Sequence, residues 1–247
     1  MDSGYYAAFA GLIARTQALD TAAANLSNAQ TPGYRAERDY FRSVVLGQEG
    51  EESQVGRVVT RYGLLGGDRL SMAQGPFQHT GNPLDLAIEG GGFFAIKTTS
   101  GIRFTRDGSF HRSSTGMLVT AANEPVLSSV KQAISVPPGQ VSVGEDGVLS
   151  INGAAAGTVG VFQFPMNTQL QAEGANRYVP PVGISPQISI DAQVHQGSIE
   201  GANEDVTRGS LDLLMMQRQA EMMQKALTVF HTEFNKTASE DLPRIQG

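Results

Sequence analysis

The feature that most constrains the fold is a seven-residue apolar repeat near the carboxyl end of the chain. A second apolar series lies three positions after the middle members of the first. The first series is Val206, Leu213, Ala220, Leu227 and Phe234, and the second is Met216, Met223 and Phe230. This pattern predicts a long helix whose apolar seam needs cover from another helix. Asn203 or Asp205 is the expected amino-terminal cap of that helix.

A second amphipathic helix is predicted at the amino end. Its heptad series is Tyr5, Leu12, Leu19 and Leu26, with Phe9, Thr16 and Ala23 four positions after the first three members. The Thr31-Pro32-Gly33 turn ends it, because a residue before proline is driven out of helical geometry. Isolated helices of this length are marginal in water, so the two helices are expected to pair with each other, with copies of themselves, or both. An arrangement in which each helix covers a central β core also remains open.

The middle of the chain is predicted to be rich in β-strands. Short runs of β-branched and aromatic residues alternate with Asp-Gly and Asn-Gly turns, which is typical of antiparallel hairpins. The expected strands are 84–88, 93–97, 102–105, 117–120, 140–143, 148–151 and 159–164. The glycine run at 89–92 is interpreted as a hairpin turn between two of them, because no Lys-Ser/Thr pair follows to make a phosphate loop.

These elements predict an α+β fold, in which a discontinuous coiled-coil pair of amino- and carboxyl-terminal helices accompanies a central antiparallel β-rich domain. Four divisions are expected along the chain. They are 1–34 for the first helix, 35–75 for an extended connecting segment, 76–199 for the β-rich domain and 200–247 for the last helix.

Composition removes several classes of function. The chain has no cysteine, so disulfides, thiolate zinc sites and cysteine nucleophiles are excluded. A net charge of −6 disfavours a nucleic-acid partner. No apolar run approaches the roughly 18–20 residues of a membrane-spanning helix. The amino end opens with an acid and meets Arg15 early, so a cleaved signal peptide is not expected.

Catalytic motifs are equally absent from the sequence. The four histidines are far apart and carry no metal-ligand spacing; they are His79, His111, His195 and His231. No GxSxG elbow marks a serine hydrolase. We therefore predict no catalytic residues, no metal and no cofactor, although a hydrolase built on two carboxylates that meet only in the fold stays open.

Four separated blocks resemble motifs of the bacterial flagellar rod and hook proteins, and they follow the same order. The blocks are ANLSNAQTPGYR at 24–35, LDLAIEGGGFF at 84–94, FTRDGSF at 104–110 with GMLVT at 116–120, and GSIEGANEDV at 197–206, with QRQAE at 217–221 inside the last helix. Ser27, Ala202 and Glu204 depart from the family's more usual residues. The opening MDSGY and the turn at 31–35 resemble the proximal-rod type, FlgF, more than the distal-rod type, FlgG.

The resemblance implies a structural subunit of the flagellar basal-body rod, the periplasm-spanning drive shaft that transmits torque and encloses the export channel. In such proteins the terminal helices line an inner tube and the β domain forms an outer layer. The implied partners are copies of this chain, other rod and hook axial proteins, and the flagellar type III export apparatus, which secretes the subunit without cleaving a signal. Neither nucleic acid nor membrane insertion is implied.

The same resemblance assigns roles to two groups of residues. Contacts of the helix pair and between subunits are expected at Leu12, Leu19, Leu26, Leu213, Met216, Met223, Leu227 and Phe230. The turn expected to set the angle between helices and β domain comprises Asn25, Asn28, Thr31, Pro32, Gly33 and Tyr34.

A different function is kept as an alternative: a periplasmic or surface β-rich module that binds a ligand such as a glycan and is oligomerised by its terminal helices. Four aromatic residues, Phe93, Phe94, Phe104 and Phe110, would then line a groove. Their alternation along the predicted strands equally fits core positions.

Overall fold

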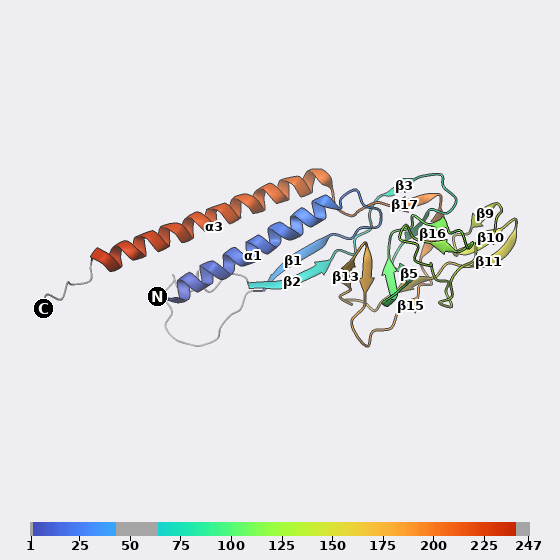
Figure 1. The fold of residues 1–247 in the computed structure, drawn as a ribbon, viewed down its shortest axis with the longest axis horizontal. Coiled ribbons are helices and arrows are strands. Elements are labelled where there is room, and N and C mark those ends of the chain that lie inside the picture. The colour runs from blue at the N-terminus through green and yellow to red at the C-terminus, as the bar shows by residue number, and fades with distance from the viewer. Residues whose placement is uncertain (1, 43–63, 241–247) are drawn as a thin grey trace. The chain divides into compact units, whose positions relative to one another are not determined.

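A computed structural model describes residues 2–42 and 64–240, with side chains described for 9–38, 69–229 and 232. Within these residues the chain forms two compact units (Figure 1). The helical unit takes the described parts of Met1–Leu26, Arg38–Asp68 and Val206–Gly247. The β unit takes Ser27–Glu37 and Arg69–Asp205. The α+β class predicted from the sequence is confirmed.

The helical unit contains the two terminal helices. Helix α1 is Asp2–Ser27 and helix α3 is Val206–Glu240, and they run side by side in opposite directions (Figure 1). The Arg15 guanidinium of α1 donates a hydrogen bond to the Gln219 side chain of α3. A two-stranded sheet joins β1, Glu37–Arg42, to β2, Leu64–Leu70. Neither helix, over its described residues, combines the length and apolar character needed to cross a membrane.

Burial along α3 follows the predicted seam from Leu213 to Leu227, whereas Val206, the first member of the predicted series, is 45% exposed. Leu213, Met216, Met223 and Leu227 are half-buried and Ala220 is buried. Residues seven apart, or alternately three and four apart, return to one side of a helix, so these five side chains form one line. The Phe230 and Phe234 side chains lie outside the described residues.

Burial along α1 departs from the expected pattern. Leu12, Leu19 and Leu26 are only half-buried, and their predicted companions Phe9, Thr16 and Ala23 are exposed. The most buried side of α1 instead carries residues with small side chains and one amide, namely Gly11, Ala14, Ala18 and Asn25. Small side chains at a contact let backbones approach closely, so the line of closest approach is displaced from the leucines.

The β unit is built of short antiparallel strands. A six-stranded sheet has the order β13-β14-β6-β5-β12-β15, and a three-stranded sheet has the order β11-β10-β9. Three two-stranded pairs, β16-β4, β17-β3 and β7-β8, complete it. The strands are β3 Phe77–His79, β4 Leu86–Glu89, β5 Phe93–Thr98, β6 Gly101–Thr105, β7 His111–Arg112, β8 Leu118–Val119, β9 Val141–Val143, β10 Val148–Ile151, β11 Ala154–Thr158, β12 Val161–Gln163, β13 Gln171–Gly174, β14 Arg177–Val179, β15 Gln187–Ile188, β16 Gln193–Gln196 and β17 Ser198–Glu200.

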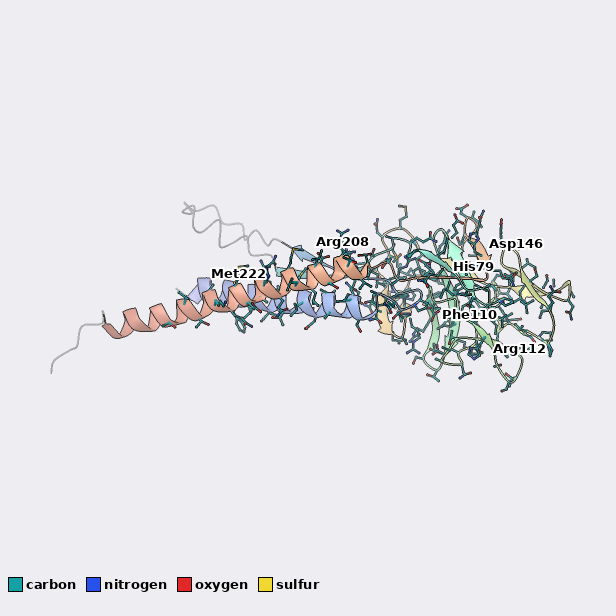
Figure 2. The ribbon with its side chains drawn as sticks, turned by 90° about the horizontal axis from the view of Figure 1, so that it is seen from above. His79, Phe110, Arg112, Asp146, Arg208 and Met222 are labelled. Carbon is teal, nitrogen blue, oxygen red and sulfur yellow. The ribbon has the colours of Figure 1, made fainter. Side chains whose placement is uncertain are left out.

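Strand β5 lies between two hydrophobic clusters. Phe94 and Ile96 belong to the larger cluster, and Phe93 and Ala95 belong to the smaller one. Successive side chains of a strand point to opposite faces, so both faces of the six-stranded sheet are covered at β5. Phe110, labelled in Figure 2, packs edge-on against Phe94 with ring centroids 5.0 Å apart.

The connection at 89–92 is not the hairpin that the sequence suggested. It joins β4, which pairs with β16, to β5, which pairs with β6 and β12. The two flanking strands therefore lie in different sheets. Local turn residues indicate that the chain turns, but the partner of each strand is decided by distant segments.

The Asn152-Gly153 turn, in contrast, does connect a hairpin, β10 to β11. Both residues have positive φ, 51° and 82°, as a two-residue type I′ turn requires. A Cβ added to Gly153 would meet no heavy atom within 4 Å, so only its backbone conformation resists a larger residue.

We expect Gly153→Ala to lower the free energy of unfolding by about 1 kcal/mol, because alanine in the left-handed region carries a steric penalty. Gly91→Ala is the matched control. Its added Cβ also meets open space, and its φ is not in that region. Urea unfolding followed by circular dichroism measures both variants, and equal effects would contradict the argument.

Candidate functional site

Three of the sequence motifs meet at one buried carboxylate in the β unit. Glu200, at the end of β17, places Oε1 3.0 Å from Nη2 of Arg35 and Oε2 2.8 Å from Nη1 of Arg106. Arg35 follows the Thr-Pro-Gly turn, and Arg106 directly follows β6. The three side chains are between 1% and 3% exposed. We call this group the Arg35–Glu200–Arg106 triad.

Backbone groups complete the surroundings of the triad. The Gly75 amide donates to Glu200 Oε1 at 2.9 Å, and the Arg35 Nη1 donates to the carbonyl of Ala73. Arg106 donates from Nη1 to the Ile88 carbonyl at 2.9 Å and from Nη2 to the Gly90 carbonyl at 2.5 Å. Its guanidinium carbon lies 5.5 Å from the centre of the Phe93 ring. The triad side chains thus bind the backbones of two separate segments, 73–75 and 88–90.

The triad carries one positive charge in excess. Two guanidiniums share a single carboxylate, and within the described residues the Nε atoms of Arg35 and Arg106 have no hydrogen-bond partner. Burial lowers the pKa of Arg106 to about 10, while Glu200 acts in the opposite direction and Arg35 lowers it further. Burial also lowers the pKa of Arg35. Both remain protonated near neutral pH, so the excess charge persists there.

Asn203 ties three segments together beside the triad. Its Oδ1 accepts from the Ala36 amide at 2.7 Å, and its Nδ2 donates to the carbonyls of Ser71 and Ala73 at 2.9 and 2.8 Å. Its own amide donates to the Tyr34 carbonyl at 3.2 Å. Of the two caps expected for the last helix, it is Asp205 that immediately precedes α3, while Asn203 serves this junction.

Gly33 shows why the turn after α1 needs glycine. Its φ is +68°, and a Cβ there would lie 2.2 Å from the amide nitrogen of Asp107. The Gly33 amide donates to the Glu200 carbonyl at 2.7 Å. The turn therefore lies directly against the segments that carry Arg106 and Glu200.

The other predicted turn residues are placed as follows. Thr31 bonds back to Asn28 through its amide, at 3.0 Å, and through its hydroxyl, at 3.3 Å. The Pro32 carbonyl accepts from the Asn176 side chain at 2.8 Å. Tyr34 is half-buried, and burial raises its pKa to about 12. Asn25 is a buried residue of α1.

The predicted helix contacts, from Leu12 to Leu227, belong to the helical unit and not to this junction. Sequence reasoning missed the triad itself, although all three residues lie inside the quoted motif blocks. Arg106 and Glu200 are 94 positions apart, so no spacing joins them. The available signal was the presence of Arg35, Arg106 and Glu200, which carry opposite charges, within three of the quoted motifs.

The histidines and the other acidic side chains form no further chemical site among the described residues. Among the described residues no group of three or more His, Asp or Glu side chains is placed to hold a metal ion. His195 pairs with Glu89 at 2.5 Å on the surface, and His79 lies 3.4 Å from the Ser198 hydroxyl. The junction therefore holds segments together and presents no catalytic arrangement.

Two known families match parts of the sequence. The family described as "Flagella basal body rod protein" matches residues 6–35, and "Flagellar hook protein FlgE/F/G D1 domain" matches residues 87–151. The first range contains Arg35 and the second contains Arg106. Two members of the triad thus lie within the matched ranges.

Individual relatives match almost the whole chain. The flagellar basal-body rod protein FlgF of Caulobacter vibrioides is 31% identical over 249 residues, covering 99% of this chain and 100% of the relative. FlgF of Mesorhizobium japonicum is 32% identical and covers 90% of each chain. The rod protein FlgG of Bacillus subtilis is 27% identical, over 90% of this chain and 93% of the relative.

We expect Glu200→Gln to destabilise the β unit by about 3–5 kcal/mol, because it leaves two buried guanidiniums without a counter-charge. Glu173→Gln is the control, since it breaks the exposed Arg103–Glu173 pair and should change the unfolding midpoint little. Urea unfolding followed by tyrosine circular dichroism compares them. Similar midpoints for both variants would contradict the assigned role of Glu200.

We expect stability to fall as pH rises from about 10 to about 12, because the unfolded chain loses tyrosine protons at the lower value. Burial raises the pKa of Tyr178 to about 12, so the folded protein keeps that proton longer. Tyr178→Phe removes its share, at most about 2.7 kcal/mol. The difference in unfolding free energy between wild type and variant should shrink across this range. A pH-independent difference would exclude the effect.

Proposed function

The chain belongs to the family of flagellar basal-body rod proteins, and from this premise we propose that it assembles helically with copies of itself and with other axial proteins into the rod. Its role is structural and not enzymatic. The higher identity with the FlgF relatives favours the FlgF type, and we assign it to the proximal rod. There it would transmit torque and enclose the export channel.

One observation carries the assembly proposal: α3 has a second apolar line besides its seam. Leu211, Met215, Met222 and Val229 are between 55% and 62% exposed. Met222 is labelled on α3 in Figure 2. These positions are four and seven residues apart, so they share one side of the helix, turned away from the seam of Leu213 and Leu227. Contiguous exposed apolar surface of this kind is typical of protein–protein interfaces.

Helix α1 adds to this surface. Phe9 and Ile13, four residues apart, are 46% and 52% exposed. A large apolar side chain gains roughly 1.5–3 kcal/mol on full burial, so covering both helices by neighbouring subunits would stabilise the assembly strongly. We therefore assign the half-buried contact residues to the helix pair, and the exposed apolar lines to subunit contacts. The first group is Leu12, Leu19, Leu26, Leu213, Met216, Met223, Leu227 and, by its place in the repeat, Phe230.

The triad supports the mechanical part of the proposal. It joins the segment that follows α1 to the segment that precedes α3, within the β unit. A shaft transmits torque only if its parts do not move relative to one another under load. Buried charge-assisted hydrogen bonds to two backbone segments, 73–75 and 88–90, limit such movement better than exposed contacts. The turn residues, from Asn25 to Tyr34, would set the direction of the chain as it leaves α1.

Location and export follow the same premise. We assign the protein to the periplasm-spanning rod, delivered by the flagellar export apparatus without signal cleavage. In this proposal 1–34 and 200–247 form the inner helical layer, 35–75 connects, and 76–199 forms the outer layer.

The alternative function, a ligand-binding β module, required four aromatic side chains to line a groove, but these side chains are buried. Phe93, Phe94, Phe104 and Phe110 are all at most 5% exposed and belong to the two core clusters. Core side chains of this kind do not contact a ligand. The structural subunit is therefore the favoured function.

We expect the double variant Leu213→Asp, Leu227→Asp to be lost from rods while its β unit stays folded, because two carboxylates enter the apolar seam of α3. The control is Gln217→Asp, Gln224→Asp, which adds the same charge at exposed polar positions of the same helix. Immunoblots of purified basal bodies and motility in soft agar report incorporation. Normal motility of the seam variant would overturn the proposal.

A further inference from the structure

A cavity of about 530 Å³ opens beside the triad, within the β unit. Its volume falls in the range of small-molecule sites, about 300–1,000 Å³. Arg35 and Arg106 line it on one side, together with Phe93, and Arg69 lines it from the end of β2. The loop from Gln163 to Leu170 forms another wall.

The charged residues that line this cavity are all positive. Three arginines line it, and the described lining residues include no Asp or Glu. The triad contributes a net positive charge that its own carboxylate leaves uncompensated, and the two Nε atoms lack acceptors within the described residues. A charge removed from water interacts strongly with any anion that enters the same low-dielectric region.

The remaining lining selects among anions. Met72 and Met166 line the cavity and are 50% and 94% exposed. Phe164 and Leu70 are further apolar residues of its lining. The amides of Gln163 and Asn167 offer neutral N–H donors. A wall that mixes thioethers and an aromatic ring with cations fits an anionic head on a carbon chain better than a fully hydrated inorganic anion.

We propose that this cavity binds a carboxylate carried on a short carbon chain, supplied by an acidic side chain of another protein or by a free small carboxylic acid. The guanidinium charges attract the carboxylate, while Met72, Met166 and Phe164 contact its carbon chain. Binding to the isolated protein tests the cavity, whereas rod incorporation tests the assembly role, so either can fail alone.

The first experiment titrates the full chain by calorimetry in low-chloride buffer at neutral pH. The probes are sodium hexanoate, the neutral hexanamide, inorganic phosphate, and capped Leu-Glu-Leu with its Leu-Gln-Leu counterpart. We expect hexanoate to bind at least about tenfold more tightly than hexanamide, which corresponds to about 1.4 kcal/mol, and more tightly than phosphate. No preference over the amide, or equal binding of phosphate, would overturn the proposal.

The peptide arm identifies the source of the carboxylate. Tighter binding of Leu-Glu-Leu than of hexanoate, lost in Leu-Gln-Leu, points to an acidic side chain of another protein. Binding of hexanoate without the peptide points to a free carboxylic acid. Both results support the site, provided that hexanoate is preferred over hexanamide, and without that preference the proposal is rejected.

The second experiment adds an anion to a lining residue of the cavity and leaves the triad residues unchanged. Gly91 lines the cavity, has a φ outside the left-handed region, and a Cβ added there meets no heavy atom within 4 Å. Gly91→Asp and Gly91→Asn add side chains of equal size and different charge. We expect Gly91→Asp to weaken hexanoate binding at least about tenfold, while Gly91→Asn retains most of it.

Thermal unfolding of the same pair gives a readout that needs no ligand. At neutral pH Gly91→Asp should melt at a higher temperature than Gly91→Asn, because its carboxylate meets the excess positive charge. The difference should vanish below about pH 3, where the aspartate is protonated. Equal melting temperatures at neutral pH, together with equal loss of hexanoate binding, would show that size alone matters and would overturn the proposal.

Discussion

The Glu200 carboxylate is the point on which the organisation of the β unit depends. It stands between Arg35 and Arg106, at 3.0 and 2.8 Å, with almost no exposure to water. A buried carboxylate of this kind is tolerated only with complete pairing, and its partners come from far along the chain. The pairing of Glu200 with Arg35 therefore joins the segment that follows α1 to the segment that precedes α3, within the β unit.

Strand β5 and helix α3 differ in how their apolar side chains are covered. The β unit buries the aromatic side chains of β5, because both faces of that strand are covered by hydrophobic clusters. The helical unit leaves Leu211, Met215, Met222 and Val229 of α3 largely exposed. An apolar helix face that the chain itself leaves exposed is suited to a polymer in which neighbouring subunits cover it.

The sequence predicted those features that depend on local periodicity. The seam of α3 and the strand at 148–151 follow from spacing alone, and the Asn152-Gly153 hairpin follows from turn chemistry. The prediction of a hairpin at the glycine run 89–92 was wrong, because strand pairing is decided by distant partners. The buried line of α1 was missed, because alanines at a close contact carry a weaker hydrophobic signal than the neighbouring leucines. The triad was not predicted for a related reason, since charge pairing across 94 positions leaves no local pattern in the sequence.

The presence of two arginines for one carboxylate has a geometric reason. Arg106 binds the Ile88 and Gly90 carbonyls as well as Glu200, which requires the planar, forked set of donors that only a guanidinium provides. A lysine would pair the charge but lacks that fork, and an apolar residue would leave the carboxylate half paired. Arg35 is needed in turn to hold the segment after Gly33 to the same carboxylate. Two geometric demands on one acid thus create the surplus positive charge, and that surplus is what makes the adjoining cavity attractive to an anion.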